Sequence, residues 1–488
     1  MDQTNNTREV DIILKRREGW VYSGKTRYPR LTMAMIYENK EFIGNIHVQQ
    51  VLENNWYGNF NWKRCSLKRR LLKISTRIFC IPLMAFLTAF HPNNSWLVHQ
   101  KESPVILFVD SSIMFIIFLF ILTWENNIDR KTMNRGFPTT YAEPFVILFT
   151  FGYLWRTMRL LMLQGVARFF RFNWNIWELI MLIFLLITIT CWIIAFLTYN
   201  IGPGNISIPR KDWPPLEPIL IAESALVFAI FMAFLKILFL IQLHPIFGPL
   251  QMSLASMLKD CLRFIVVIII FLVAFGVGVN NLYSYYEGMK YNGTDGESKK
   301  QGDSFISFWQ TLLTLYWSMF GLSERSSAEL VIENGNEHYL TEATGFILFT
   351  AFAFTMIIVV INMLIASLTN SYQRVQDNNM DEWAYGKTQV FLNHMDGILV
   401  IPVPFNMLFE WINDLRSFIQ DMRNKNKKWH CSFFHGCFMA DVHGEENERE
   451  YLSLMSEIRS RYFLKNCKLF SLGVPQISDD FCANDDDD

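Results

Sequence analysis

The sequence predicts an all-α membrane protein with six transmembrane helices, a re-entrant pore loop between the fifth and the sixth, and further helices on the cytoplasmic side. Three observations predict this class. The 488-residue chain is 51% hydrophobic and only 18% charged, whereas soluble proteins carry about 25% charged residues. Six apolar windows each reach the roughly 20 helical residues that cross a hydrocarbon core. A shorter amphiphilic stretch lies between the last two windows.

Composition excludes several other classes. The formal net charge of −1, without a basic arm, gives no reason to expect a nucleic-acid partner. The eight cysteines are scattered and form no dense disulfide pattern. Because the first residues are polar and charged, we expect no cleavable signal peptide and insertion through internal spans. No nucleotide-binding or hydrolase motif appears, so the chain is not expected to be an enzyme.

The chain begins with a polar region, residues 1–75, that we interpret as cytoplasmic linker helices. Residues 76–103 follow as an elbow before the first span. Its apolar part, residues 79–90, contains Pro82 and is too short to cross a bilayer, so a re-entrant or interfacial segment is predicted. Basic residues crowd the positions just before it, which favours the cytoplasmic side.

The six windows divide into two groups. Four form a sensor-like domain over residues 104–243, and two belong to a pore domain over residues 244–373. The windows cover residues 104–124, 144–164, 177–199, 219–243, 261–283 and 344–369. The distribution of basic residues predicts that both termini are cytoplasmic. Glycosylation sequons at Asn205 and Asn292 then fall in outside loops, although Arg130, Lys131 and Arg135 lie in a loop that is also assigned outside.

The fourth window argues against steep voltage gating. Voltage sensors carry several arginines in register, but this window has only Lys236 near its cytoplasmic end. A single cation in an apolar span needs a partner. We predict that Lys236 pairs with Glu178 in the third window.

Residues 304–324 are predicted to form the pore loop. The segment is too short to span and too apolar for an ordinary loop, and irregular backbone at membrane depth survives only beside protein or water. A half-helix ending near Met319 would return through Gly321. Phe320, Gly321 and Leu322 would then form the selectivity filter, and copies of Glu324 would form a carboxylate ring that attracts cations. The alternative is an interfacial helix lying flat on the outer leaflet.

The inner helix, residues 344–373, carries the candidate lower gate. Ile365, Thr369 and Gln373 recur at helical spacing on one face, and an apolar ring can close a pore by dewetting. Asn362 is a polar residue in an apolar helix and must face water or a partner. Packing against the fifth span is the alternative role for each of these side chains.

Two features follow the pore domain. Residues 377–396 are predicted to form a coupling helix, and residues 397–488 to form C-terminal helices and a tail, with an amphipathic stretch at 448–464. Four residues, His430, Cys431, His435 and Cys437, have ligand types that suit zinc. Packing, or acylation of a cysteine beside basic residues, is the alternative.

Several stretches together resemble the TRPC subfamily of transient receptor potential cation channels, over roughly residues 7–410 and faintly over 448–464. They are Phe247-Gly-Pro-Leu-Gln251, Asn281-Leu-Tyr-Ser-Tyr-Tyr-Glu287, Phe320-Gly-Leu-Ser-Glu324, Asn362-Met-Leu-Ile-Ala366 and Glu382-Trp383. The pattern before the membrane part, including Trp56-Tyr-Gly-Asn-Phe60, is similar to the linker helices of that subfamily.

The resemblance implies a homo- or heterotetramer with related subunits, non-selective and permeable to calcium and sodium, in the plasma membrane. It implies opening through phospholipase C by diacylglycerol or related lipids, with membrane lipids, calmodulin and G-protein pathway components as partners and no certain cofactor. Glu382 and Trp383 would belong to the coupling helix under the linker between the fourth and fifth spans. Leu315, Tyr316 and Trp317 would line a lipid pocket, and Asn175 and Glu178 would contribute to a cytosolic calcium site.

The sequence departs from the subfamily pattern at several places. The ankyrin repeats of the subfamily would precede the point where this chain begins, so we expect a chain without them or a short product. The second-span positions of the calcium site are Thr157 and Leu160, the pore helix has Tyr316 in place of Phe, and the coupling helix has Gly386. A non-conducting regulatory or dominant-negative subunit is therefore the main alternative to a conducting channel.

Overall fold

The computed structural model describes most of the chain. The described residues are 7–15, 27–58, 67–90, 103–126, 135–136, 141–202, 208–288, 290–292, 298–300, 304–322, 328–330, 338–395, 401–407 and 444–471. They divide into two compact units, one within Met1–Gly248 and Met380–Asp488 and the other within Pro249–Asn379. We describe each unit by itself.

The first unit is helical. Its helices are α1 (Thr7–Lys15), α2 (Pro29–Ile36), α3 (Lys40–Gly44), α4 (Ile46–Tyr57), α5 (Leu67–Phe90), α7 (Pro104–Asn126), α8 (Glu143–Gln164), α9 (Val166–Arg171), α10 (Asn173–Ala195), α11 (Pro218–Leu235), α12 (Ile237–Ile241), α17 (Asn379–Met395) and α19 (Gly444–Ser471). A π-helical turn, Phe196–Ile201, extends α10, and a 3-10 turn, Arg210–Asp212, precedes α11.

The second unit consists of long helices and one short hairpin. It contains α13 (Phe247–Tyr283, with its first two residues in the first unit), a 3-10 turn (Ser284–Tyr286), the strands β1 (Lys290–Asn292) and β2 (Ser298–Lys300), α14 (Phe308–Ser318), α15 (Tyr339–Phe354), a π-helix (Thr355–Val360) and α16 (Ile361–Asp377). The two strands pair antiparallel, with Lys290 opposite Lys300.

The six predicted spans are confirmed, since the described residues contain six helices long and apolar enough to cross a membrane. They are Pro104–Glu125, Glu143–Met162, Asn173–Ile201, Pro218–Ile241, Phe247–Tyr286 and Tyr339–Asp377. One predicted bound was wrong, since the fifth helix begins at Phe247 rather than 261. The predicted elbow residues 79–90 belong to one helix that passes through Pro82. The predicted all-α class is confirmed, and the described residues add one short hairpin of β1 and β2.

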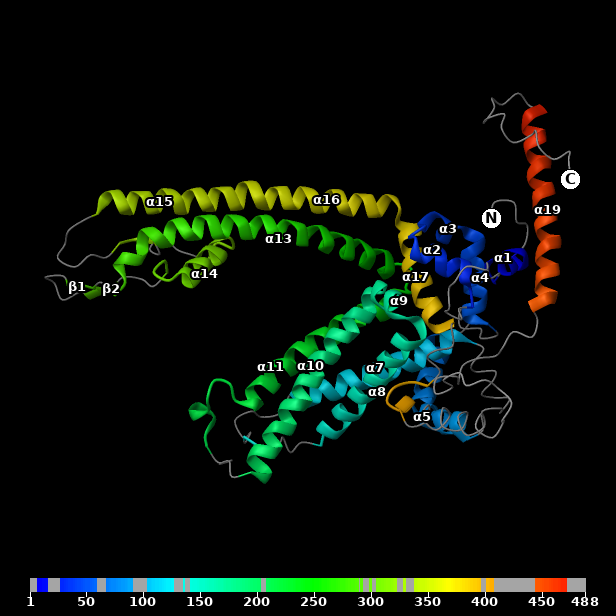
Figure 1. The fold of residues 1–488 in the computed structure, drawn as a ribbon, viewed down its shortest axis with the longest axis horizontal. Coiled ribbons are helices and arrows are strands. Elements are labelled where there is room, and N and C mark those ends of the chain that lie inside the picture. Colours follow the sequence, from blue (N-terminus) through cyan, green and yellow to red (C-terminus); the bar gives the residue numbers. More distant parts are fainter. Residues whose placement is uncertain are drawn as a thin grey trace. The chain divides into compact units, whose positions relative to one another are not determined.

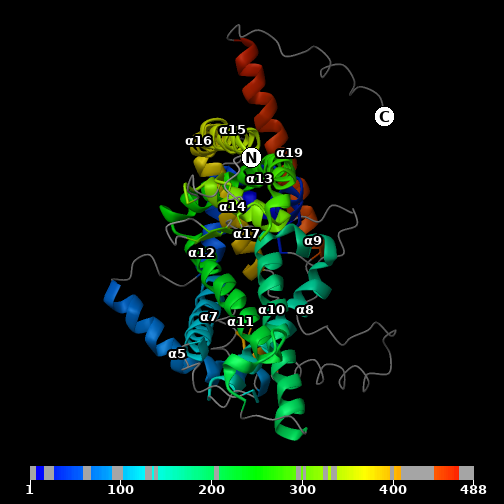
Figure 2. The ribbon, with the colours of Figure 1, turned by 90° about the vertical axis from the view of Figure 1, so that its left-hand side faces the viewer.

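The helices α7, α8, α10 and α11 lie side by side as a four-helix bundle (Figure 1 and Figure 2). Apolar side chains from all four helices form one core, and the Phe118 and Phe149 rings stack at 5.2 Å between α7 and α8. Small residues on α11, including Ala222 and Ala229, are fully buried in this core. Small side chains let neighbouring helices approach closely, which suits packing in lipid.

A buried ion pair closes one end of this bundle. Arg135 donates to both carboxylate oxygens of Glu217, at 3.2 and 2.6 Å, and its guanidinium lies 4.7 Å from the centre of the Tyr199 ring. Such a bidentate pair is strong and geometrically specific. Arg135 therefore has a structural role in the loop after α7, which explains why a basic residue occurs in a loop assigned to the outside.

The segment 401–407 folds back onto α8 at Gly152. The Asn406 amide donates to the Gly152 carbonyl at 3.0 Å, and a Cβ at Gly152 would lie 2.7 Å from Val403. Val403 itself is buried in the bundle core. The absence of a side chain at Gly152 is what permits this docking.

The amino-terminal helices pack with α17 and the start of α7 in a second core. Trp56 on α4 stacks on Phe391 of α17 at 4.2 Å, and Lys387 of α17 forms an ion pair with Glu53 of α4 at 3.0 Å. The Gln49 amide donates to the Thr388 hydroxyl at 3.0 Å. The coupling helix is thus held by the linker helices through stacking, charge and hydrogen bonding.

We expect His394 to make this core sensitive to acid. Its Nδ1–H donates to the Val390 carbonyl at 3.0 Å, and its ring meets Phe108 edge-on at 5.3 Å. Burial lowers the pKa of His394 to about 4, and the positive charge of Arg156 adds to this lowering. Because the unfolded chain binds the proton with a pKa of about 6.5, stability is full above that pH and falls as the pH drops toward 4.

We expect His394→Phe to remove this acid dependence. The loss in the wild type amounts to about 3 kcal/mol once His394 is protonated. The measurement is the melting temperature of the purified protein between neutral pH and pH 5. The wild type should lose stability more steeply than His394→Phe, and parallel curves would show that His394 does not titrate on unfolding.

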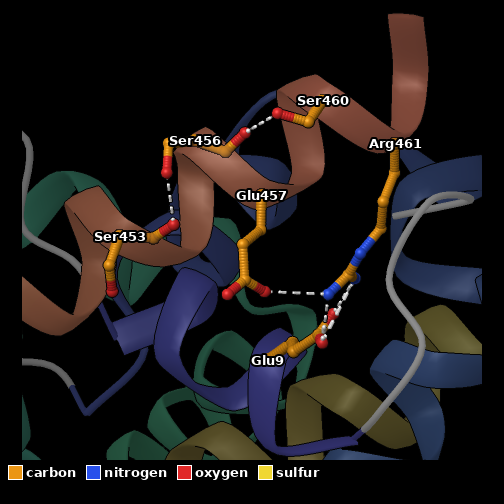
Figure 3. A network of polar contacts seen from close by, with 6 residues as sticks. All are labelled: Glu9, Ser453, Ser456, Glu457, Ser460 and Arg461. Carbon is orange, nitrogen blue, oxygen red and sulfur yellow. Dashed lines mark hydrogen bonds and ion pairs between the residues drawn. The ribbon is translucent and has the colours of Figure 1, made fainter. Parts of the chain in front are cut away.

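The helix α19 docks on α1 at the edge of the first unit (Figure 3). The Arg461 guanidinium donates to both oxygens of Glu9, at 3.0 and 3.2 Å, and to Glu457 at 3.0 Å. Tyr451 and Leu454 pack against Ile13 beside this network. The carboxyl-terminal helix is therefore attached to the linker helices rather than free.

Candidate pore and coupling site

The candidate pore begins with the short helix α14, which packs against α13. Gly276 of α13 has no side chain where α14 approaches, and a Cβ there would lie 2.9 Å from Leu312. Leu315 of α14 is fully buried in the core of the second unit. The sequence makes α14 helical over Phe308–Ser318, which is too short to cross a membrane.

The region around α14 is held in place by Tyr283 at the end of α13. The Tyr283 hydroxyl donates to the Ala328 carbonyl at 2.7 Å, and its ring contacts Phe305 at 5.4 Å. Gly345 of α15 leaves space for the Tyr283 ring, because a Cβ there would collide with the hydroxyl. These contacts join the segments before and after α14 to the two long helices.

The chain turns at Gly321, directly after α14. The Leu322 N–H donates to the Trp317 carbonyl at 3.2 Å, and Gly321 has φ of +73°. Phe320 and Leu322 are exposed in the single chain. The filter residues predicted from the sequence thus lie in a turn that leads away from the helix, while Glu324 lies outside the described residues.

Gly321→Ala is expected to disturb this turn. A side chain in the left-handed region costs about 1–2 kcal/mol per residue, and a tetramer would carry the change four times. We expect a loss of cation current in cell recordings at unchanged surface expression. Gly278→Ala is the matched control, because its Cβ would meet Leu348 only at 4.0 Å. Equal currents in both variants would contradict the importance of this turn.

The predicted gate residues Ile365, Thr369 and Gln373 share one exposed face of α16. Asn362 is also exposed in the single chain, whereas Ser371 and Val375 are buried. The Asn362 amide donates to the Ile358 carbonyl at 2.7 Å, so its own helix satisfies it. The π-helix Thr355–Val360 directly precedes this face, and such turns occur often at functional sites.

A polar clasp joins α13 to α16. Asp260 of α13 accepts a hydrogen bond from the Ser371 hydroxyl of α16 and lies 3.7 Å from the Arg374 guanidinium. Arg263, one turn along α13, also pairs with Asp260 at 3.0 Å. Asp260 and Ser371 are both buried. No local sequence pattern predicts this clasp, because its two residues lie 111 positions apart.

The coupling helix α17 contacts the linker that precedes α13. The Trp383 indole donates to the Gln242 carbonyl at 3.1 Å, and the same ring lies against Gly248, where a Cβ would clash. Glu382 forms an ion pair with Lys40 of α3. Trp174 of α10 donates to the Gln242 side chain at 3.0 Å. Gln242 therefore connects the sensor-like bundle to the coupling helix, and Gly386 is accommodated as a buried residue within α17.

The two residues that the resemblance assigned to a calcium site, Asn175 and Glu178, both have partners within the chain. The Asn175 amide donates to the Phe169 carbonyl at 3.2 Å. The Glu178 carboxylate is taken by Lys236 at 2.7 Å, which confirms the predicted Lys236–Glu178 pair. Calcium needs six to eight oxygen ligands, and the described residues contain no group of three His, Cys, Asp or Glu side chains placed to hold a metal.

The three residues assigned to a lipid pocket are consecutive on α14 and differ in burial. Leu315 is buried among the helices of its unit, whereas Tyr316 and Trp317 are exposed in the single chain. The Tyr316 and Trp317 rings contact Phe320, at 5.3 and 6.4 Å between centroids. The two exposed aromatic residues belong to the same surface as the predicted filter.

The predicted glycosylation and metal sites lie mostly outside the described part of the chain. The sequon at Asn205 and the candidate metal ligands His430, Cys431, His435 and Cys437 lie outside the described residues. Asn292 ends β1, opposite Ser298. The metal and glycosylation sites stay predictions.

The family of the chain follows from the fold and from sequence comparison. The fold is that of a channel-type membrane protein. It has six apolar helices, a short helix with a turn before the last of them, and a helix that returns to the sensor-like bundle. The family model described as ion transport protein matches residues 105–380. The chain belongs to the ion transport protein family, which is a family of channels rather than enzymes.

Curated relatives are transient receptor potential channels, in agreement with the resemblance of the sequence to the TRPC subfamily. The chain is 30% identical over 417 residues to short transient receptor potential channel 4 of Mus musculus, a match over 84% of this chain and 42% of the relative. Short transient receptor potential channel 3 of Homo sapiens is 28% identical over 428 residues, covering 80% of this chain and 45% of the relative. The chain thus spans less than half the length of these relatives.

Solved structures agree with the fold. The cryo-EM structure of the thermo-sensitive channel TRP1 from the alga Chlamydomonas reinhardtii, in nanodiscs, superimposes with a TM-score of 0.65 at 18% identity. The match covers 96% of this chain and 60% of that one. At this identity the similarity establishes the arrangement of the helices.

Proposed function

We propose that the chain is one subunit of a tetrameric, non-selective cation channel that is permeable to calcium and lies in the plasma membrane with both termini cytoplasmic. The observation that carries the proposal is the short helix α14 with the turn at Gly321, held between the helices of the second unit. A half-helix that enters and leaves from the same side is the layout of a pore loop.

The distribution of exposed apolar surface supports assembly into a tetramer. In the most apolar part of α7, 56% of the residues are buried within the single chain, against only 11% in the span formed by α13. The pore helices therefore need other surfaces, namely lipid and further subunits, to cover them. The exposed face of α16 with Ile365, Thr369 and Gln373 would then line the central path in a homo- or heterotetramer.

The proposed stimulus is a lipid signal such as diacylglycerol downstream of phospholipase C, with calmodulin or G-protein pathway components as candidate partners. This part rests on the similarity to short transient receptor potential channels. Weak voltage dependence is proposed because Lys236, the one cation of α11 and its end, is bound to Glu178. A fixed pair carries little gating charge across the membrane.

The test is whole-cell recording of the chain expressed alone, with a diacylglycerol analogue as stimulus, beside Glu324→Gln and Glu324→Asp. We expect a cation current whose calcium permeability or divalent block falls in Glu324→Gln and persists in Glu324→Asp. A carboxylate ring attracts cations only while it is charged. Currents that are identical in all three would remove Glu324 from the filter.

Absence of current would favour the alternative function, a non-conducting regulatory subunit, under one further condition. A chain that reaches the cell surface, gives no current and suppresses a co-expressed relative would be a non-conducting regulatory subunit. That outcome would overturn the conducting channel as proposed.

A further inference from the structure

The bundle of the first unit contains a buried ion centre near the end where α9 joins α8 to α10 and α12 follows α11. Lys236 follows α11, and its ammonium lies 2.7 Å from Glu178 Oε2 of α10. The Arg156 guanidinium of α8 lies 3.9 Å from Glu178 Oε1. Lys236 and Glu178 are both buried, at 6% exposure each. Two cations therefore share one carboxylate inside the bundle.

Two aromatic rings complete the surroundings of the ammonium. Lys236 Nζ lies 4.7 Å from the centre of the Phe115 ring of α7 and 5.1 Å from that of Tyr153 of α8. Aromatic faces beside a carboxylate are the chemistry by which proteins recognise organic ammonium ions. The centre thus draws on all four helices of the bundle.

The side chains around the ammonium are poor ligands for a divalent cation. Phe115 offers no oxygen ligand, and among the described residues Glu178 Oε1 receives no hydrogen bond, although Arg156 is near it. A calcium ion would have to displace the Lys236 ammonium and tolerate the Arg156 charge beside it. With two cations and one anion, the centre already has one positive charge in excess.

We propose that Lys236 is a tethered ammonium that permanently occupies the cation position of the sensor-like bundle, so that cytosolic calcium does not bind there. The ammonium joins α11 to α10 through Glu178 and to α7 and α8 through the aromatic rings. A covalently attached ion cannot dissociate, so the tie between the helices does not depend on the calcium concentration. The bundle then responds to other stimuli while this contact holds it together.

The inference deepens the proposed function, since it concerns which stimulus the sensor-like bundle can receive. Its test uses the melting temperature of the purified full chain in detergent and needs no ion current. Failure of the inference and failure of the proposed channel function are therefore distinguishable.

The first arm measures calcium binding. The chain with Glu324→Gln, which removes the predicted pore carboxylate, is melted in chelator and in calcium chloride. We expect no shift of the melting temperature. A calcium-dependent rise that disappears when Glu178→Gln is added would overturn the proposal, because calcium would then bind at the ion centre.

The second arm measures ammonium binding. Lys236→Ala removes the ammonium and leaves its space, so we expect a lower melting temperature that n-butylammonium chloride restores in part. Lys236→Met fills the space without charge and serves as the control, with no expected response to the amine. Buried pairs lose stability when one partner is removed, because the other charge stays behind.

The ammonium-binding arm can either support or overturn the proposed ammonium site. A response to the amine in Lys236→Ala alone supports an ammonium site. Equal melting temperatures of the wild type and Lys236→Met, with no amine response in Lys236→Ala, would overturn the proposal. If Lys236→Ala does not fold, Glu178→Gln is compared with the double variant Glu178→Gln/Lys236→Met. We expect Glu178→Gln to have a lower melting temperature than the wild type and the double variant to have the same melting temperature as Glu178→Gln. Additive losses in the double variant would contradict the pair.

Discussion

Gly248→Ala is expected to uncouple the stimulus from the gate. A Cβ at this position would clash with the Trp383 indole and with the Gln242 carbonyl, which are themselves joined by a hydrogen bond of 3.1 Å. Overpacking of this kind costs about 1–3 kcal/mol, and the lost hydrogen bond adds about 1 kcal/mol. Because α17 would no longer follow the linker, the ratio of stimulated to basal current should fall about tenfold or more.

The measurement compares agonist-evoked and basal currents in the same cells, at matched surface expression. Gly278→Ala is again the control, since its Cβ would only touch Leu348. Ion selectivity should stay unchanged, because Gly248 belongs to the first unit and not to the second unit, which contains α14 and α16. A stimulation ratio equal to that of the wild type would show that the Trp383–Gln242 contact does not transmit the stimulus.

Asp260→Asn is expected to raise the basal open probability. Asp260 accepts the hydrogen bond of the buried Ser371 hydroxyl and faces Arg263 and Arg374. Hydrogen bonds to charged groups contribute about 1.5–3 kcal/mol. Since α16 carries the predicted gate, weakening its attachment to α13 should favour movement of that helix, with an increase in basal current of about tenfold.

A double-mutant cycle with Ser371→Ala isolates the clasp. The double variant should be little worse than either single variant, because both remove the same contact. Asp377→Asn on the exposed end of α16 is the matched control and should behave as the wild type. Additive effects of Asp260→Asn and Ser371→Ala would contradict a direct energetic connection between them.

The spans could be predicted because length and hydropathy alone are enough to recognise a membrane helix in a sequence. The Lys236–Glu178 pair was accessible for a related reason, since a lone charge in an apolar helix must find a partner. The start of the fifth helix was placed too late because Ser253, Lys259 and Asp260 lower the local hydropathy without interrupting the helix. Hydropathy indicates which part of a helix lies in lipid, whereas helix propensity indicates where the helical backbone begins and ends.

Contacts between distant segments could not be predicted. Nothing local in the sequence connects Arg135 with Glu217, Gly152 with Asn406, or Asp260 with Ser371. The partners of Glu178 depend on packing in the same way. Glu178 matched the required residue type, but its occupation by Lys236 and the approach of Arg156 depend on how three helices pack.

The candidate pore residues occupy positions that are compatible with the predicted pore loop and gate. The residues expected in the filter lie at a turn after α14, and those expected at the gate share one exposed face of α16. Their roles in conduction stay predictions until current is measured.

The most direct test of the pore is a recording from the purified chain alone in planar bilayers under a potassium chloride gradient. The proposed channel predicts single-channel steps whose reversal potential lies close to the potassium equilibrium potential. Absence of any conductance, or reversal at the chloride equilibrium potential, would contradict a cation path formed by residues 304–324 and α16.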